Sequence, residues 1–190
     1  MLFCFPHSAK GADTDKTAEY LIDTVKSPTV ASVGGEWTVI GLARSDASVT
    51  ELYFDTYYAN VSSVVKSKKG VLHERKYTEC SRVVIALTAI GKDPENVSGY
   101  DLVKPLTDYE KTTQQGINGA LWALIALDCG DYGNADIRNK YVDYLLSREK
   151  KNGGWSLSAS SADAETDITA MVLTALSRYT YRTDVKIAVD

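Results

Sequence analysis

The sequence predicts an all-α protein assembled from repeated helical hairpins. Four apolar segments align with one another, and each has a small residue followed by leucine, the small residues being Gly41, Ala86, Ala126 and Ala175. Their intervals of 45, 40 and 49 residues lie within the period of about 20–50 residues that is typical of stacked supersecondary units. Between them lie amphipathic segments whose apolar residues fall three, four or seven positions apart, as in a helix with one solvent-exposed face.

The four aligned segments are predicted to be inner helices, because each is apolar around most of its circumference, as in a helix buried on all sides. They cover residues 36–45, 82–91, 121–130 and 170–179. The amphipathic segments are predicted to be outer helices, marked by Tyr57 to Val65, by Ile137 to Leu145 and by two further stretches considered next.

The ends of the outer helices are predicted from capping and helix-breaking residues. The first should cover residues 15–26, with Thr14 or Asp15 as its N-cap, and should stop before Pro28, since a residue ahead of proline disfavours helix. Asn152-Gly153-Gly154 is expected to end the fourth. The third, residues 100–110, is the weakest prediction because it contains Pro105.

Composition places the chain among ordinary globular proteins. Apolar residues make up 44% of the 190 positions and charged residues 24%. The net charge of −4 provides no basic field for nucleic acid or for an anionic membrane. No apolar run approaches the roughly 18 residues of a membrane span. We therefore expect no nucleic-acid partner and no membrane span.

The N-terminal residues and the cysteines are expected to lie outside any chemistry. Residues 1–13 begin with an apolar stretch that lacks a basic n-region, and they are interpreted as a disordered leader or an expression remnant. Residues 14–190 form the predicted folded domain. The cysteines are three in number, which is odd, and Cys80 and Cys129 are predicted to be free buried thiols.

Two glycine-glycine-aromatic turns suggest that the hairpins close toward a ring and do not form an open superhelical solenoid. Gly34-Gly35-Glu36-Trp37 opens the first inner helix, and Asn152-Gly153-Gly154-Trp155 follows the fourth outer helix. These turns resemble those of terpenoid cyclases and protein prenyltransferase β-subunits, although Glu149 stands where the cyclase motif has glutamine. The resemblance covers about residues 15–190 and implies an α/α-toroid.

A closer resemblance is to bacterial secreted or surface proteins that carry a prenyltransferase-like toroid ahead of small β-domains, which are fold relatives of transcobalamin and intrinsic factor. It rests on the two turns above and on residues 73–79, Asn118-Gly119 and residues 167–171. The resemblance implies an extracellular or cell-surface bacterial location. It also implies more hairpins than the four found here and the start of another at residues 184–190, so we expect a partial ring, truncated before closure, with possible self-association through its open end.

The candidate site residues cluster just before the inner helices or in their first turns. If those helices run alongside one another, their N-termini converge on one mouth of a central cavity. The alternative is that the acidic members only cap helices. The ligand-binding candidates are Glu36, Trp37, Tyr77, Glu79, Arg82, Gln114, Asn118, Trp122, Asp163, Glu165 and Asp167.

The motifs of the best-known enzymes of this shape are not found in the sequence. Asp163-Ala164-Glu165-Thr166-Asp167 lacks the adjacent carboxyl pair of the cyclase Asp-X-Asp-Asp acid. The prenyltransferase zinc site needs Asp-X-Cys and a later histidine, whereas Asp128 and Cys129 are adjacent and the histidines are His7 and His73. Neither cysteine context matches a Gly-Cys-Gly-Glu-Gln thioester. We predict no catalytic residues, no metal and no cofactor.

The function expected from these observations is a non-catalytic ligand-binding or protein-interaction module with a small-molecule, lipidic or peptide ligand. The alternatives are a fragment of a prenyltransferase or terpenoid-cyclase-like enzyme, and a cobalamin-type carrier. The basic stretch from Lys66 to Lys76, which contains His73, is interpreted as solvated surface, with a partner-docking patch as the alternative.

Overall fold

The computed structural model describes residues 13–190, in which the regular elements are helices joined by loops, without a β-strand. The all-α prediction is therefore confirmed. None of the helices in the described part has the length and apolar character needed to cross a bilayer. The predicted leader falls almost wholly on residues 1–12, which lie outside the described residues.

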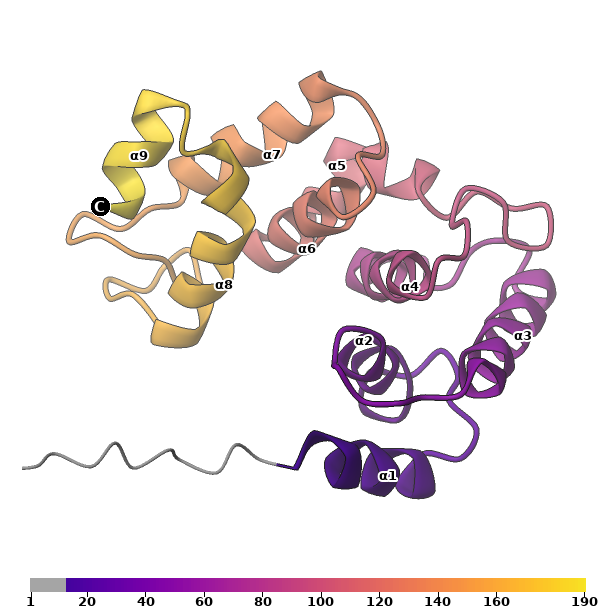
Figure 1. Cartoon of the computed structure of the whole chain (residues 1–190). Coiled ribbons are helices and arrows are strands. Elements are labelled where there is room, and N and C mark those ends of the chain that lie inside the picture. Colours follow the sequence, from indigo (N-terminus) through magenta and orange to yellow (C-terminus); the bar gives the residue numbers. More distant parts are fainter. Residues whose placement is uncertain (1–12) are drawn as a thin grey trace, which may run out of the picture.

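Four helices lie side by side along the concave side of a curved array (Figure 1). They are α2 (Trp37–Ala43), α4 (Tyr77–Ala89), α6 (Ile117–Asp128) and α8 (Thr166–Leu176). Each overlaps one predicted inner segment, although α4, α6 and α8 begin and end a few residues before the predicted bounds. Helix α4 packs between α2 and α6, and α6 packs between α4 and α8. The apolar side chains of α6 are therefore buried on several sides of the helix.

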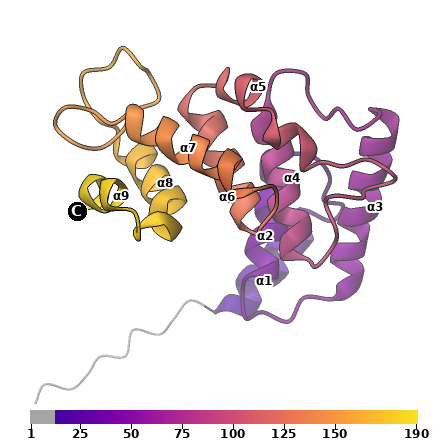
Figure 2. The same ribbon diagram turned by 90° about the horizontal axis from the view of Figure 1, so that it is seen from above.

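The other side of the array is formed by α3 (Glu51–Ser67), α5 (Tyr109–Thr113) and α7 (Ala135–Ser147) (Figures 1 and 2). In α3 the buried residues are Tyr53, Tyr57, Val61 and Val65, one every fourth position, which is the stripe of an amphipathic helix. Helix α1 (Thr14–Thr24) precedes α2, and α9 (Thr183–Val189) follows α8.

The predicted helix ends required three corrections. Asp13, and not Thr14 or Asp15, is the N-cap of α1, since its carboxylate accepts a hydrogen bond from the Lys16 N–H at 3.2 Å. Helix α7 ends at Ser147, several residues before the glycine pair. Residues 100–110 do not form one helix: a 3-10 turn over Lys104–Thr107 precedes α5, because Pro105 lacks the N–H that a continuous helix requires.

Two glycines permit close backbone approaches that hold the inner helices in place. A Cβ at Gly35 would overlap the carbonyl oxygen of Thr29, and a Cβ at Gly119 would overlap that of Thr112. Gly35 has a non-helical backbone conformation within the kinked turn Ser32–Glu36 that leads into α2. Gly119 lets α6 pack directly on the end of α5. Any larger residue would force these backbone segments apart.

The two described cysteines differ in burial, so the prediction of two buried thiols was wrong for one of them. Cys80 is buried and its Sγ donates to the Leu102 carbonyl at 2.9 Å, whereas Cys129 is exposed. Burial raises the pKa of the Cys80 thiol to about 12. Cys129 immediately follows the last residue of α6, and its Sγ donates to the Ala126 carbonyl at 3.1 Å.

This difference predicts selective thiol chemistry. In a Cys4→Ser background, Cys129 should react with Ellman's reagent at least about a hundredfold faster than Cys80, because the thiolate is the reactive species and Cys80 is both protonated and inaccessible. Adding Cys129→Ser should remove the fast phase, and urea should restore a reaction at Cys80. Two thiols of equal rate in the folded protein would contradict the burial of Cys80.

Candidate functional site

Two of the predicted site residues form a buried ion pair between α2 and α4. Glu36 is fully buried where the turn Ser32–Glu36 meets α2, and its Oε2 lies 3.4 Å from Nε of Arg82. Its Oε1 accepts a hydrogen bond from the Ala31 N–H at 3.1 Å. The Arg82 side chain is 17% exposed. Glu36 therefore joins the turn to α4, although it does not cap α2 through its side chain.

Tyr57 of α3 is a third polar group beside this pair. Its side chain is fully buried and its hydroxyl has no hydrogen-bond partner among the described residues. Burial raises its pKa well above the ordinary value, and the Glu36 charge adds to that rise. Burial likewise raises the pKa of Glu36, partly offset by Arg82. The sequence analysis placed Tyr57 on an apolar helix face and did not anticipate this neighbourhood.

Two of the predicted aromatic residues meet across α4. The rings of Trp37, from α2, and Trp122, from α6, are in edge-to-face contact with centroids 5.1 Å apart. Because α4 lies between α2 and α6, the pair spans the intervening helix. Trp37 remains 39% exposed and Trp122 is partly buried. One turn before Trp122, Asn118 has a buried Oδ1 without a partner.

The remaining candidates near α4 and α6 differ in their burial. Tyr77 is partly buried against the core, and Glu79 lies in the first turn of α4. Gln114 is exposed. Its neighbour Gln115, which the sequence analysis passed over, accepts a hydrogen bond from the Thr78 N–H at 3.0 Å and so links α4 to the start of α6. Consecutive glutamines cannot be distinguished by sequence alone, since the helix start decides which one turns inward.

The acidic residues before α8 are exposed and shape a long loop. Asp163, Glu165 and Asp167 all face solvent. Glu165 folds the loop back on itself: its Oε2 accepts from the Leu157 N–H at 3.0 Å, and its own N–H donates to the Trp155 carbonyl at 2.7 Å. Asp167 lies in the first turn of α8, where a carboxylate favours the helix dipole. No described contact joins these carboxylates to Glu36.

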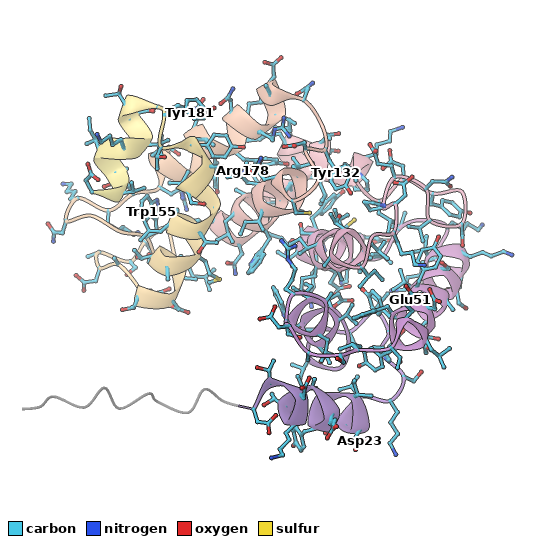
Figure 3. The ribbon with its side chains drawn as sticks, viewed as in Figure 1. Asp23, Glu51, Tyr132, Trp155, Arg178 and Tyr181 are labelled. Atoms are coloured by element: carbon cyan, nitrogen blue, oxygen red, sulfur yellow. The ribbon has the colours of Figure 1, made fainter. Side chains whose placement is uncertain are left out.

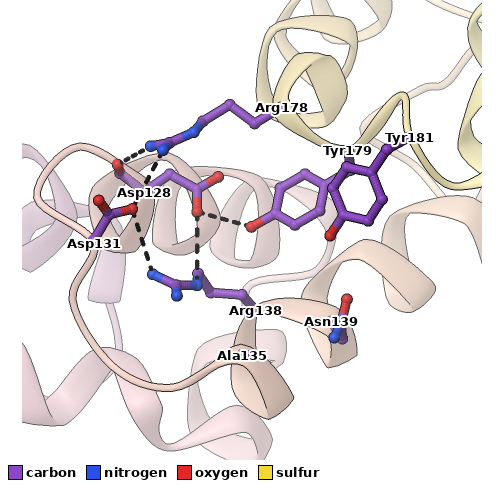
Figure 4. A pocket seen from close by; sticks show the side chains of 8 residues that line it. All are labelled: Asp128, Asp131, Ala135, Arg138, Asn139, Arg178, Tyr179 and Tyr181. Carbon is purple, nitrogen blue, oxygen red and sulfur yellow. Dashed lines mark hydrogen bonds and ion pairs between the residues drawn. The ribbon is translucent and has the colours of Figure 1, made fainter.

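A cavity that the sequence analysis did not anticipate lies at the other ends of the inner helices. It has a volume of about 190 Å³ and opens between the end of α6, the start of α7 and the turn after α8 (Figure 4). The Tyr179 hydroxyl donates to Oδ1 of Asp128 at 2.7 Å, and the Arg178 guanidinium donates to the Asp128 carbonyl. The lining residues are Asp128, Asp131, Ala135, Arg138, Asn139, Arg178, Tyr179 and Tyr181.

The charges in this cavity are already paired with one another. Arg178 approaches Asp131 at 3.3 Å, and Arg138 lies 3.9 Å from Asp128 and 4.0 Å from Asp131. Burial raises the pKa of Asp128, while its bond to Tyr179 acts in the opposite direction. Two guanidinium groups thus face two carboxylates. The arrangement ties three hairpin segments together and leaves no uncompensated charge for a ligand.

Comparison with protein families, characterised proteins and solved structures finds no significant match to this chain. Within residues 13–190 the side chains of His, Cys, Asp and Glu form no group of three suited to a metal ion. Among the described residues, the Trp37–Trp122 pair presents a partly exposed aromatic surface, and Glu36, next to Trp37 in sequence, forms a buried ion pair with Arg82.

Proposed function

We propose that this protein is a non-catalytic binding module whose ligand lies against the concave face around Trp37 and Trp122. The partly exposed tryptophan pair carries this proposal. Each ring is held by the other, so the pair offers a large apolar area at little conformational cost. Asn118, one turn before Trp122, has a buried Oδ1 without a partner, so it is not a surface acceptor for the ligand. The exposed aromatic area suits a small, lipidic or peptide ligand that has an apolar group.

The proposed architecture behind this face is a partial α/α-toroid. The alternation of inner and outer helices around a curved array (Figure 1) supports it. The resemblance of the two turns, residues 73–79, Asn118-Gly119 and residues 167–171 to bacterial secreted or surface proteins supports an extracellular or cell-surface bacterial location. An enzyme acting on isoprenyl diphosphates is less well supported, because a diphosphate needs several free cationic groups, and Arg82 is engaged by Glu36. Cobalamin binding rests on fold analogy alone.

A ligand screen read out by tryptophan fluorescence tests this proposal. The purified protein would be titrated with isoprenyl diphosphates, cobalamins, glycans, fatty acids and peptides. A true ligand should change the emission of Trp37 and Trp122, whereas the buried Trp155 acts as an internal reference. Trp37→Ser should weaken that ligand about tenfold or more, since aromatic anchors dominate binding energy. Tyr181→Ser, which alters an exposed aromatic residue elsewhere, is the matched control.

Two results would contradict the proposal. One is a ligand whose affinity is unchanged by Trp37→Ser and by a corresponding Trp122→Phe variant. The other is tight isoprenyl diphosphate binding accompanied by turnover, which would restore the enzyme alternative. Thermal melts of each variant establish that a loss of binding does not arise from unfolding.

A further inference from the structure

The connection between α3 and α4 concentrates positive charge on an otherwise acidic protein. Residues 66–76 contain five cationic side chains and one carboxylate, a net charge of +4, while the whole chain carries −4. All residues outside this segment therefore carry a net charge of −8. Four of the five cations are exposed and make neither an ion pair nor a side-chain hydrogen bond within residues 13–190: Lys66, Lys69, Arg75 and Lys76. We name residues 66–76 the basic loop.

Hydrogen bonds and close packing hold the first half of the basic loop. Gly70 donates to the Val65 carbonyl at 2.9 Å, which closes the C-terminus of α3. The ring of Tyr100 packs so closely on Gly70 that a Cβ there would overlap it. Lys68 folds inward, and its Nζ donates to the Leu72 carbonyl at 2.7 Å. These contacts hold the first half of the loop in one conformation.

The second half of the basic loop is held by the burial of one residue and by hydrogen bonds to another. Leu72 is buried in the core. The Nδ1 of His73 accepts hydrogen bonds from the N–H groups of Arg75 and Lys76, at 3.1 and 3.0 Å. The cationic side chains thus project from a backbone that is already ordered, and a partner that binds them does not bear the entropy of ordering the loop.

A shallow hollow in the basic loop combines an apolar floor with a cationic rim. Its volume is about 520 Å³, and it is lined by Lys68, Val71, Leu72, His73, Glu74 and Arg75. Val71 is 55% exposed, so an apolar side chain is offered to solvent among charged neighbours. A matching partner needs carboxylates on either side of an apolar group.

We propose that the basic loop is a docking site for a short acidic polypeptide segment that carries an apolar side chain between its carboxylates. A short segment touches the loop alone. An anionic membrane or a nucleic acid presents an extended negative surface, which the net charge of −4 on the whole chain disfavours. The site is separate from the Trp37–Trp122 face, and the proposal stands independently of the one made there.

Fluorescence anisotropy with a labelled peptide tests this proposal. The probe is a short peptide of alternating glutamate and leucine, and its control replaces each glutamate with glutamine. Binding should be detectable for the glutamate peptide only, and it should weaken steeply as salt rises from about 50 to about 300 mM. The variant Lys69→Gln/Arg75→Gln/Lys76→Gln should bind about tenfold or more weakly.

The matched control is Lys26→Gln/Lys140→Gln/Lys186→Gln, which removes the same charge from exposed lysines elsewhere and should retain most of the affinity. Val71→Ser should weaken binding without altering its salt dependence. The proposal is overturned if both triple variants lose affinity equally, or if anionic phosphatidylserine vesicles or single-stranded RNA bind more tightly than the peptide. Concentration-dependent self-association through the loop, measured by light scattering, would also overturn it.

Discussion

Trp155→Ala is expected to lower the free energy of unfolding by about 3–5 kcal/mol, as large-to-small changes of buried tryptophan do. Trp155 is 1% exposed and lies between α7 and α8 (Figure 3). Its indole N–H donates to the Leu145 carbonyl at 2.7 Å, and its backbone N–H donates to Oγ1 of Thr169 at 2.9 Å. The substitution leaves a cavity and removes one of two hydrogen bonds to the Leu145 carbonyl, which also accepts from the Arg148 N–H at 3.0 Å.

Urea unfolding followed by circular dichroism measures this effect. Trp155→Phe retains most of the ring volume but not the donor, so it should fall between the wild type and Trp155→Ala. Leu157→Ala, at an exposed position two residues later, is the control and should change stability by less than about 0.5 kcal/mol. If Trp155→Ala lowered the free energy of unfolding by less than about 1 kcal/mol, the contacts of Trp155 with α7 and α8 would not be an important source of stability.

Arg82→Met is expected to lower the free energy of unfolding at neutral pH by about 3–5 kcal/mol, because removing one partner leaves the Glu36 carboxylate buried and uncompensated. Glu36 is fully buried and its nearest cation is Arg82 at 3.4 Å. The double variant Glu36→Gln/Arg82→Met should recover much of the loss, since no buried charge then remains. A double variant as unstable as Arg82→Met alone would show that the arginine acts by packing and not by its charge.

The same pair predicts a definite dependence on pH. Burial raises the folded-state pKa of Glu36 above its ordinary value of 4.5. At a pH between the unfolded-state pKa and the folded-state pKa, the native state therefore holds more protons than the unfolded state. The stability that Glu36 contributes is then fully present below the unfolded pKa and is lost as pH rises through the folded pKa.

Removing Arg82 should raise the folded pKa of Glu36 further, because an attracting positive charge is lost. The penalty of Arg82→Met should therefore be smaller at about pH 5 than at about pH 8. Urea titrations at both pH values provide the comparison, and the Glu36→Gln background should abolish the difference. A penalty that is equal at both pH values, or larger at the lower one, would contradict the assigned role of Glu36.

The parts of the fold that were predictable are those decided by neighbouring residues. The four apolar segments identified α2, α4, α6 and α8, and Pro28 correctly predicted that α1 stops ahead of it. Helical periodicity and proline geometry act within a few positions of the chain, so a short window contains the whole signal. Where two local signals competed, as at Thr14 beside Asp13, the boundary shifted by a residue.

The candidate site was predictable only as a set of residue types in the right helices. Trp37 and Trp122, like Glu36 and Arg82, were selected individually because each lies in or near the first turns of an inner helix. Their partnership depends on how far α2 and α6 are rotated and displaced against α4. That rotation follows from side-chain ridges meeting grooves over the whole interface, and no short window of sequence contains it.

By itself the sequence determined the helical class, the order of inner and outer helices and the cationic character of residues 66–76, because each follows from composition or from contacts a few residues apart. Only the tertiary structure decided that Glu36 meets Arg82, that Asp128 meets Tyr179, and that Glu165 remains in an exposed loop. The Glu36–Arg82 and Asp128–Tyr179 pairs join residues 46 and 51 positions apart in the sequence. Their geometry is set when apolar faces pack and bring distant helix ends within hydrogen-bonding distance.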